Sequence, residues 1–89
     1  MKILWTPPFE RDFRALPRPL QKRVEKTLRL LALNPRHPSL QAKKMEGTQK
    51  VWEARVSLSY RITYQLAEDA LLLRRVGTHD ILRKEGSQE

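Results

Sequence analysis

The spacing of the hydrophobic residues changes once along this chain, and that change limits the folds it can adopt. From Leu20 to Leu31 apolar residues recur at intervals of three and four, which is one stripe of an amphipathic helix. After Lys50 they alternate with polar residues, the pattern of a strand with one buried face. Helices are therefore expected first, and strands after them.

Prolines divide the helical part into two segments. Thr6-Pro7 supplies a capping hydroxyl and a proline at the first helical position, Pro17 and Pro19 interrupt the pattern, and Asn34-Pro35 ends it. The exposed side of the second segment carries the basic residues Lys22, Arg23, Lys26 and Arg29. These features predict a helical hairpin with a basic exterior.

Strands are predicted at Ile3–Trp5, Val51–Val56, Leu58–Leu66 and Leu71–Val76. The order β-α-α-β-β-β indicates an α+β fold in which a helical hairpin packs on one face of a small, mainly antiparallel four-stranded sheet. The other face of the sheet is expected to stay open and to carry any working site. Trp5, Tyr60 and Tyr64 are expected in the core.

Composition narrows the class of protein. A chain of 89 residues with 39% hydrophobic content and no long apolar run predicts a single soluble domain over residues 1–89, with no membrane span and no deep cofactor cavity. No cysteine and two histidines argue against disulfides, thiolate chemistry and metal sites, so neither metal nor cofactor is expected. The first ten residues lack the pattern of a secretory signal, which predicts a cytoplasmic protein.

The net charge of +8 points to anionic partners. Most of the excess lies in residues 10–29 and 36–61, on either side of a proline turn. Two such regions are typical of a surface that follows a phosphate backbone, and equally of a solvated surface that keeps a small protein soluble.

Four residues in the strand region carry candidate chemistry: Glu53, Arg55, Arg61 and His79. Arg61 offers a planar fork for phosphate oxygens, and His79 titrates near neutrality. Glu53 is the alternative general base. The structural alternatives are a cross-strand ion pair of Arg61 with Glu53 and a turn role for His79; for His37, a capping role is preferred over a catalytic one.

Several short motifs, taken in order, resemble the RelE/ParE superfamily of bacterial and archaeal toxins, over nearly the whole chain. They are Lys43-Lys44-Met45-Glu46-Gly47, Trp52-Glu53-Ala54-Arg55, Tyr60-Arg61-Ile62-Thr63-Tyr64 and Val76-Gly77-Thr78-His79-Asp80. The resemblance implies a RelE-like fold and a ribosome-dependent mRNA endonuclease, which cleaves mRNA in the ribosomal A site without a metal. It also implies a cognate antitoxin that neutralises the toxin in a hetero-oligomeric complex.

The resemblance also implies roles for individual residues. Arg61 matches the strand arginine that contacts the scissile phosphate, and His79 matches a catalytic histidine of YafQ-like and YoeB-like toxins. Glu53 and Arg55 fall where RelE has two lysines, so Glu53 departs from that pattern. Basic residues expected to contact mRNA or ribosomal RNA are Lys43, Lys44, Lys50, Lys22, Arg23 and Lys26.

Two other functions remain open at this point. One is a ParE-like toxin that inhibits DNA gyrase by binding it, without chemistry of its own. The other is a catalytically inactive relative that binds only antitoxin. The grouping of titratable residues around Arg61 argues against the gyrase inhibitor, because a pure binder does not need it. The inactive relative predicts that substituting His79 changes nothing.

Overall fold

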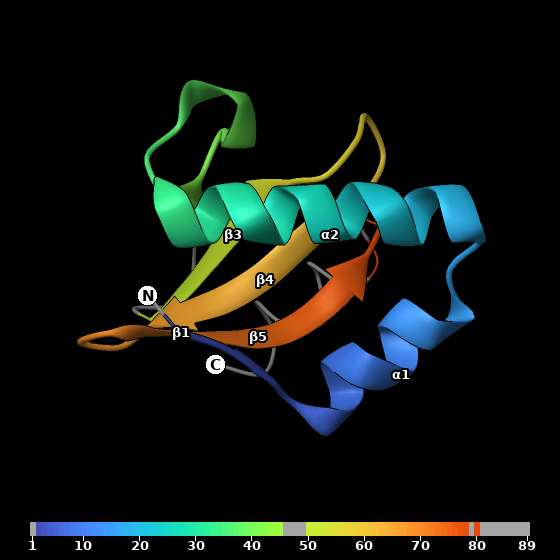
Figure 1. Ribbon diagram of the computed structural model, residues 1–89, viewed down its shortest axis with the longest axis horizontal. Helices are drawn as coiled ribbons and strands as arrows, with labels where there is room; N and C mark the ends of the chain where they lie inside the picture. Colours follow the sequence, from blue (N-terminus) through green and yellow to red (C-terminus); the bar gives the residue numbers. More distant parts are fainter. Residues whose placement is uncertain (1, 46–49, 79, 81–89) are drawn as a thin grey trace.

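The structure is a computed structural model that describes residues 2–45, 50–78 and 80. Two helices lie against one sheet, with α2 crossing in front of the strands and α1 beside the end of β5 (Figure 1). The predicted α+β class and the order of helices and strands are confirmed. The elements are β1 (Lys2–Trp5), α1 (Pro7–Ala15), α2 (Arg18–Leu33), the 3₁₀ helix η1 (Pro38–Leu40), β2 (Lys43–Lys44), β3 (Val51–Arg55), β4 (Arg61–Leu66) and β5 (Ala70–Gly77).

The sheet has five strands in the order β1-β5-β4-β3-β2, where four were predicted. β1 pairs in parallel with β5, and the other pairs are antiparallel. The additional strand, β2, is two residues long, and the Met45 N–H donates to the Val51 carbonyl (2.9 Å) just beyond it. A strand this short has no readable periodicity, because only its pairing with β3 defines it.

The capping residue of α1 also joins the helix to the sheet. The Thr6 hydroxyl accepts from the Phe9 N–H (3.4 Å) and donates to the Leu73 carbonyl of β5 (2.7 Å). Pro7 follows at the first helical position, where its missing N–H costs nothing. The predicted cap is therefore confirmed, and it sets the angle at which the chain leaves β1.

The core lies between α2 and the sheet. The stripe predicted from Leu20 faces inward, with Val24, Leu28 and Leu31 buried and Leu20 half-buried. These side chains meet buried residues of β3, β4 and β5, and each fully buried large side chain contributes roughly 1.5 to 3 kcal/mol. The sheet residues in this cluster are Ala54, Ile62, Tyr64, Leu71, Leu73 and Val76.

Two of the aromatic residues expected in the core lie outside it. Trp5 is 40% exposed, because it belongs to an edge strand and packs edge-on against Phe9 and Phe13 from the outside. Tyr60 is half-buried in a turn. Tyr64 alone of the three is fully buried, at 1% exposure.

β4 begins at Arg61, three residues later than predicted. Residues 56–60 form the connection from β3, closed by the Val56 N–H donating to the Tyr60 carbonyl (3.0 Å), and Leu58 is 79% exposed. The alternation between Leu58 and Tyr60 is therefore a coincidence of spacing within the turn, and it does not mark a strand.

A register shift next to Arg74 explains the burial pattern of β5. Tyr64 lies opposite Leu73 while Thr63 lies opposite Arg75, so the pairing register skips Arg74. The extra residue changes the alternation of faces. As a result Leu73 and Val76, which are three residues apart, both face the core.

Asp12 of α1 covers the part of the β5 edge that β1 does not reach. β1 pairs with β5 only as far as Leu73. Beyond it, the Asp12 carboxylate accepts from the Val76 N–H (3.2 Å) and from Nε and Nη2 of Arg75 (2.6 and 3.1 Å). A carboxylate thus takes the acceptor role of a strand carbonyl and also pairs a strand arginine.

Candidate functional site

Glu53 of β3 and Arg61 of β4 form the centre of the predicted site. They lie on the sheet face away from α2, where Glu53 is opposite Thr63 and Arg61 is opposite Arg55. Arg61 Nε lies 3.9 Å from Glu53 Oε1, an ion-pair distance longer than a hydrogen bond. The Arg61 side chain is 17% exposed and the Glu53 side chain is 12% exposed, so this part of the face is less open than expected.

Arg61 also holds the turn that precedes it. Its Nη1 donates to the carbonyls of Ser57 (2.7 Å), Tyr60 (3.1 Å) and Leu58 (3.3 Å). Among the described residues, Nη2 of Arg61 has no hydrogen-bond partner. The guanidinium is therefore fixed on one side by protein, and its remaining donors are available to an oxygen ligand.

A carboxylate beside a fixed guanidinium has definite chemical uses. The carboxylate can remove a proton from a hydroxyl, and the guanidinium can stabilise negative charge on phosphate oxygens. The structural alternative for Arg61, an ion pair with Glu53, therefore coexists with a functional one, because the same pair presents both groups on one face.

The predicted RNA-binding lysines fall at different places. Lys43 of β2 lies opposite Glu53, next to the pair, whereas Lys44 lies opposite Trp52, at the position that alternates to the other face. Lys50 precedes β3 and is exposed. Lys22 is exposed on α2.

Arg55 does not join Glu53 and Arg61. Although it lies opposite Arg61 in the strand register, its Nη1 donates to Oε1 of Gln41 (3.2 Å), beyond η1. Arg55 lines a hollow of about 170 Å³ together with Arg23 and Lys26 of α2. Arg55 therefore lies near Arg23 and Lys26, two residues that are predicted from the sequence to contact RNA.

The two histidines have separate outcomes. His79 lies outside the described residues, so its predicted part in the site stays a prediction. His37 caps η1, since its Nδ1 accepts from the Ser39 N–H (3.1 Å), which confirms the capping role. Within the described part of the chain, no group of three or more His, Asp or Glu residues comes together.

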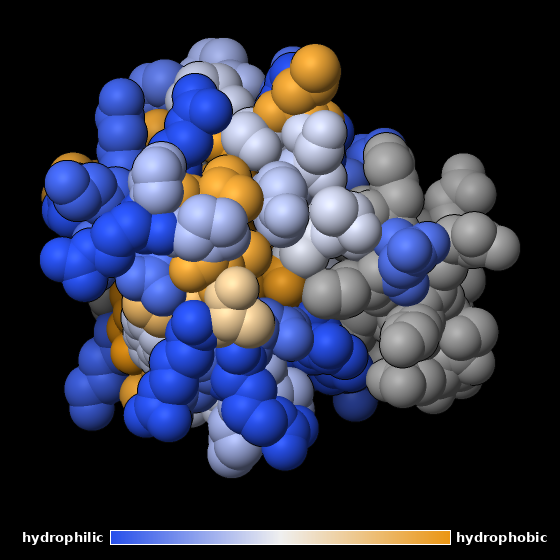
Figure 2. All heavy atoms as spheres, turned by 90° about the vertical axis from the view of Figure 1, so that its right-hand side faces the viewer, coloured by the Kyte–Doolittle hydropathy of each residue, from blue (hydrophilic) through white to orange (hydrophobic). Residues whose placement is uncertain are grey.

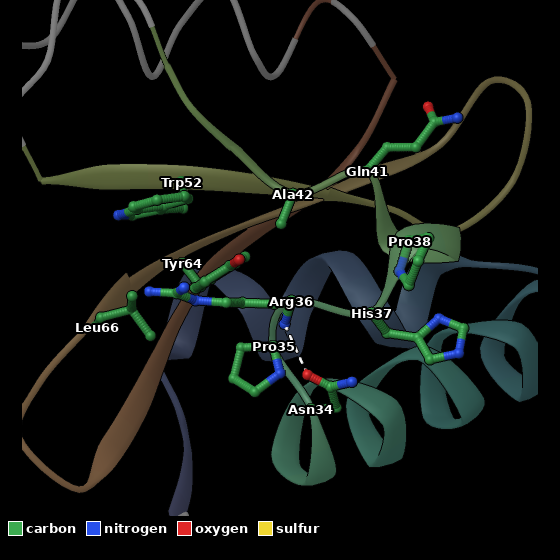
Figure 3. A pocket seen from close by; sticks show the side chains of 10 residues that line it. All are labelled: Asn34, Pro35, Arg36, His37, Pro38, Gln41, Ala42, Trp52, Tyr64 and Leu66. Atoms are coloured by element: carbon green, nitrogen blue, oxygen red, sulfur yellow. Dashed lines mark hydrogen bonds between the residues drawn. The ribbon is translucent and has the colours of Figure 1, made fainter.

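A hollow of about 560 Å³ that the sequence did not indicate lies between the end of α2 and the sheet. Trp52, Tyr64 and Leu66 line it from the strands, and the Arg36 side chain extends toward them while the His37 ring points away (Figure 3). Desolvation by burial raises the pKa of Tyr64 to about 12. Trp52 lies opposite Tyr64 in the strand register, whereas the loop that completes the hollow has no periodic pattern.

The surface around α1 and the start of α2 is mostly hydrophilic. Figure 2 shows this side, where polar and charged side chains surround a smaller group of hydrophobic ones. The four basic residues predicted on the exterior of α2 are all exposed. Neither helix in the described ranges has the length and apolarity needed to cross a bilayer.

The sequence comparison decides the family. Residues 3–82, most of the chain, match the family described as the ParE toxin of the type II toxin–antitoxin system parDE. The chain belongs to this toxin family. The predicted membership of the RelE/ParE superfamily is thereby confirmed. No curated protein sequence matches the chain.

Solved structures of similar toxins confirm the RelE-like fold. Escherichia coli YafQ superposes with a TM-score of 0.77 at 19% identity, covering 91% of this chain and 96% of YafQ. A YoeB/ParE toxin from Agrobacterium tumefaciens gives 0.77 at 16% identity, covering 89% and 99%. RelE in the RelB–RelE complex of Methanococcus jannaschii gives 0.73 at 21% identity, covering 90% and 94%.

Proposed function

We propose that this toxin is a ribosome-dependent mRNA endonuclease that cleaves mRNA in the ribosomal A site and so blocks translation. The observation that carries the proposal is the Glu53–Arg61 pair, a carboxylate 3.9 Å from a guanidinium that is anchored by the adjacent turn. Because the proposed target is the ribosome, the toxin would act in the cytoplasm.

The proposed reaction needs three groups. Glu53 accepts the proton of a ribose 2′-hydroxyl as that oxygen bonds to the adjacent phosphorus. Arg61 stabilises the charge on the phosphate oxygens, and His79 donates a proton to the 5′-oxygen as the P–O5′ bond breaks. The products are a 2′,3′-cyclic phosphate and a free 5′-hydroxyl, which balances the two proton transfers.

Basic residues outside the pair supply substrate affinity in this proposal. Lys43 is beside Glu53 in the strand register, and Lys50, Lys22, Arg23 and Lys26 add exposed positive charge. Lys44 contacts RNA from the neighbouring position on β2. Such contacts position a phosphate backbone and carry no base preference.

We also propose a cognate antitoxin as protein partner. The family belongs to type II toxin–antitoxin systems, and the similar archaeal RelE is in complex with RelB. A surface of net charge +8 that binds RNA has to be masked when the toxin is inactive.

The test is primer extension on a defined mRNA incubated with purified toxin, with and without ribosomes that have an empty A site. Cleavage is expected only with ribosomes. Glu53→Gln and His79→Gln should each lower the cleavage rate by roughly 100-fold or more, the usual effect of removing an acid or base. Glu68→Gln, an exposed carboxylate in the β4–β5 turn, is the matched control and should cleave normally.

The match to the ParE family favours a second candidate, inhibition of DNA gyrase by binding. It predicts intact mRNA in both tubes and loss of gyrase supercoiling activity, which Glu53→Gln would leave unchanged. A relative that binds only antitoxin predicts neither effect and no growth arrest on expression.

A further inference from the structure

We propose that Arg55, Arg23 and Lys26 form a binding site for one phosphate group of an RNA backbone, separate from the Glu53–Arg61 pair. We call this the α2–β3 hollow; its volume is about 170 Å³. It rests on the proposed function only in taking RNA as the source of the phosphate.

Three positively charged side chains gather at the hollow. Arg23 and Lys26 come from successive turns of α2, and Arg55 comes from the end of β3. None of the described residues that line the hollow is acidic. Three cations without a carboxylate repel one another, and such a cluster is favourable when an anion lies between them.

A hydrogen bond to Gln41 directs the Arg55 side chain. Gln41 follows η1 in a left-handed conformation (φ 46°), which is uncommon for a residue with a side chain. Its Oε1 accepts from Arg55 Nη1 at 3.2 Å. Arg55 is thereby held at the hollow, away from Glu53, and has donors left to offer an anion.

The floor of the hollow is apolar. Leu30, Leu40 and Val56 line it, and Leu40 is 1% exposed. An apolar floor lowers the local dielectric constant, so an anion is attracted more strongly there than on a flat hydrated surface. The hollow has room for a phosphate group, which favours a contact with the RNA backbone.

Binding can be measured without cleavage by using a 2′-O-methyl RNA hexanucleotide, which lacks the attacking hydroxyl. Fluorescence anisotropy with the full-length toxin should show that Arg55→Gln and Arg23→Gln each weaken affinity by about fivefold. Each should also reduce the slope of log affinity against log salt by about 0.7, the value for one lost contact to single-stranded RNA. Arg29→Gln, an exposed arginine of α2 that does not line the hollow, is the matched control and should change affinity less than about twofold.

Inorganic phosphate provides a second measurement on the unmutated toxin. Compared with sodium chloride at equal ionic strength, it should shift the backbone amide NMR signals of Thr27, Ser39 and Val56, which line the hollow. Equal losses in Arg55→Gln and Arg29→Gln, or phosphate shifts spread evenly over the surface, would overturn the site. Phosphate binding in the hollow with RNA affinity independent of Arg55 would overturn the RNA assignment.

These outcomes are distinguishable from failure of the proposed function. If mRNA is cleaved on ribosomes but the hollow binds neither probe, the inference is wrong and the endonuclease stands. If the hollow binds both probes but mRNA stays intact, the inference stands as a property of an RNA-binding toxin.

Discussion

The Glu53–Arg61 pair and the α2–β3 hollow both contain arginines from neighbouring strand positions, but they differ in how positive charge is compensated. Arg61 has a carboxylate at 3.9 Å and three carbonyl acceptors, all supplied by the protein. Within the described ranges, Arg55 has one neutral amide acceptor and two neighbouring cations. Both regions leave guanidinium donors for a ligand, but only the first has a carboxylate of its own that balances the positive charge.

The largest expected difference between the two regions is in stability. Arg61→Ala removes three hydrogen bonds and leaves Glu53, 12% exposed, without its cation. We expect a loss of about 2 to 3 kcal/mol in the free energy of unfolding, and about 0.5 kcal/mol or less for Arg55→Ala. Urea denaturation of both variants measures this, and equal losses would contradict the comparison.

Tyr64 shows what desolvation does to a buried ionisable group, and the effect on stability should be somewhat smaller. Its pKa is raised from 10.0 to about 12 by desolvation, so the folded state holds the phenol proton more tightly than the unfolded chain does. This contribution is present below pH 10 and is lost between pH 10 and about 12.

The corresponding measurement compares the toxin with Tyr64→Phe in urea denaturation between pH 9 and about 12. The unmutated toxin should lose on the order of 2 kcal/mol more than the variant over this range. Parallel pH profiles for the two proteins would mean that burial at Tyr64 does not penalise the phenolate.

The smallest effect concerns repulsion in the hollow. Lys26→Gln keeps helix propensity nearly unchanged and removes one of three like charges. We expect a gain of about 0.3 kcal/mol at low salt that disappears near ~1 M salt, where the charges are screened. Lys22→Gln, on the same helix but outside the hollow, is the control; an equal gain there would show a general effect of net charge.

The proximity of Glu53 and Arg61 was predictable from the sequence. Both are on successive strands joined by a short connection, and strand alternation puts them on the same face. The cap at Thr6, the stripe along α2 and the cap at His37 were predictable for the same reason, since each depends on residues a few positions apart. The role of Arg61 in holding residues 57–60 was not predictable, because the alternation from Leu58 predicts a strand where the structure has a turn.

The separation of Arg55 from Arg61 was not predictable from alternation, which places them together. A hydrogen bond to Gln41 and the approach of α2 decide where the guanidinium lies. The same holds for β2, which exists only through pairing, and for the hollow beside Trp52, which needs the loop after α2 to close it.

Hydrophobic spacing, proline positions and capping residues therefore determined the helices, the main strands and the face on which each strand residue lies. Those signals act over a few residues, so they can be recognised in the sequence. Only the tertiary structure decided which cations meet, which edge Asp12 covers and where hollows form. Those outcomes depend on contacts between segments far apart in the chain and on the directions of long side chains, which local spacing does not specify.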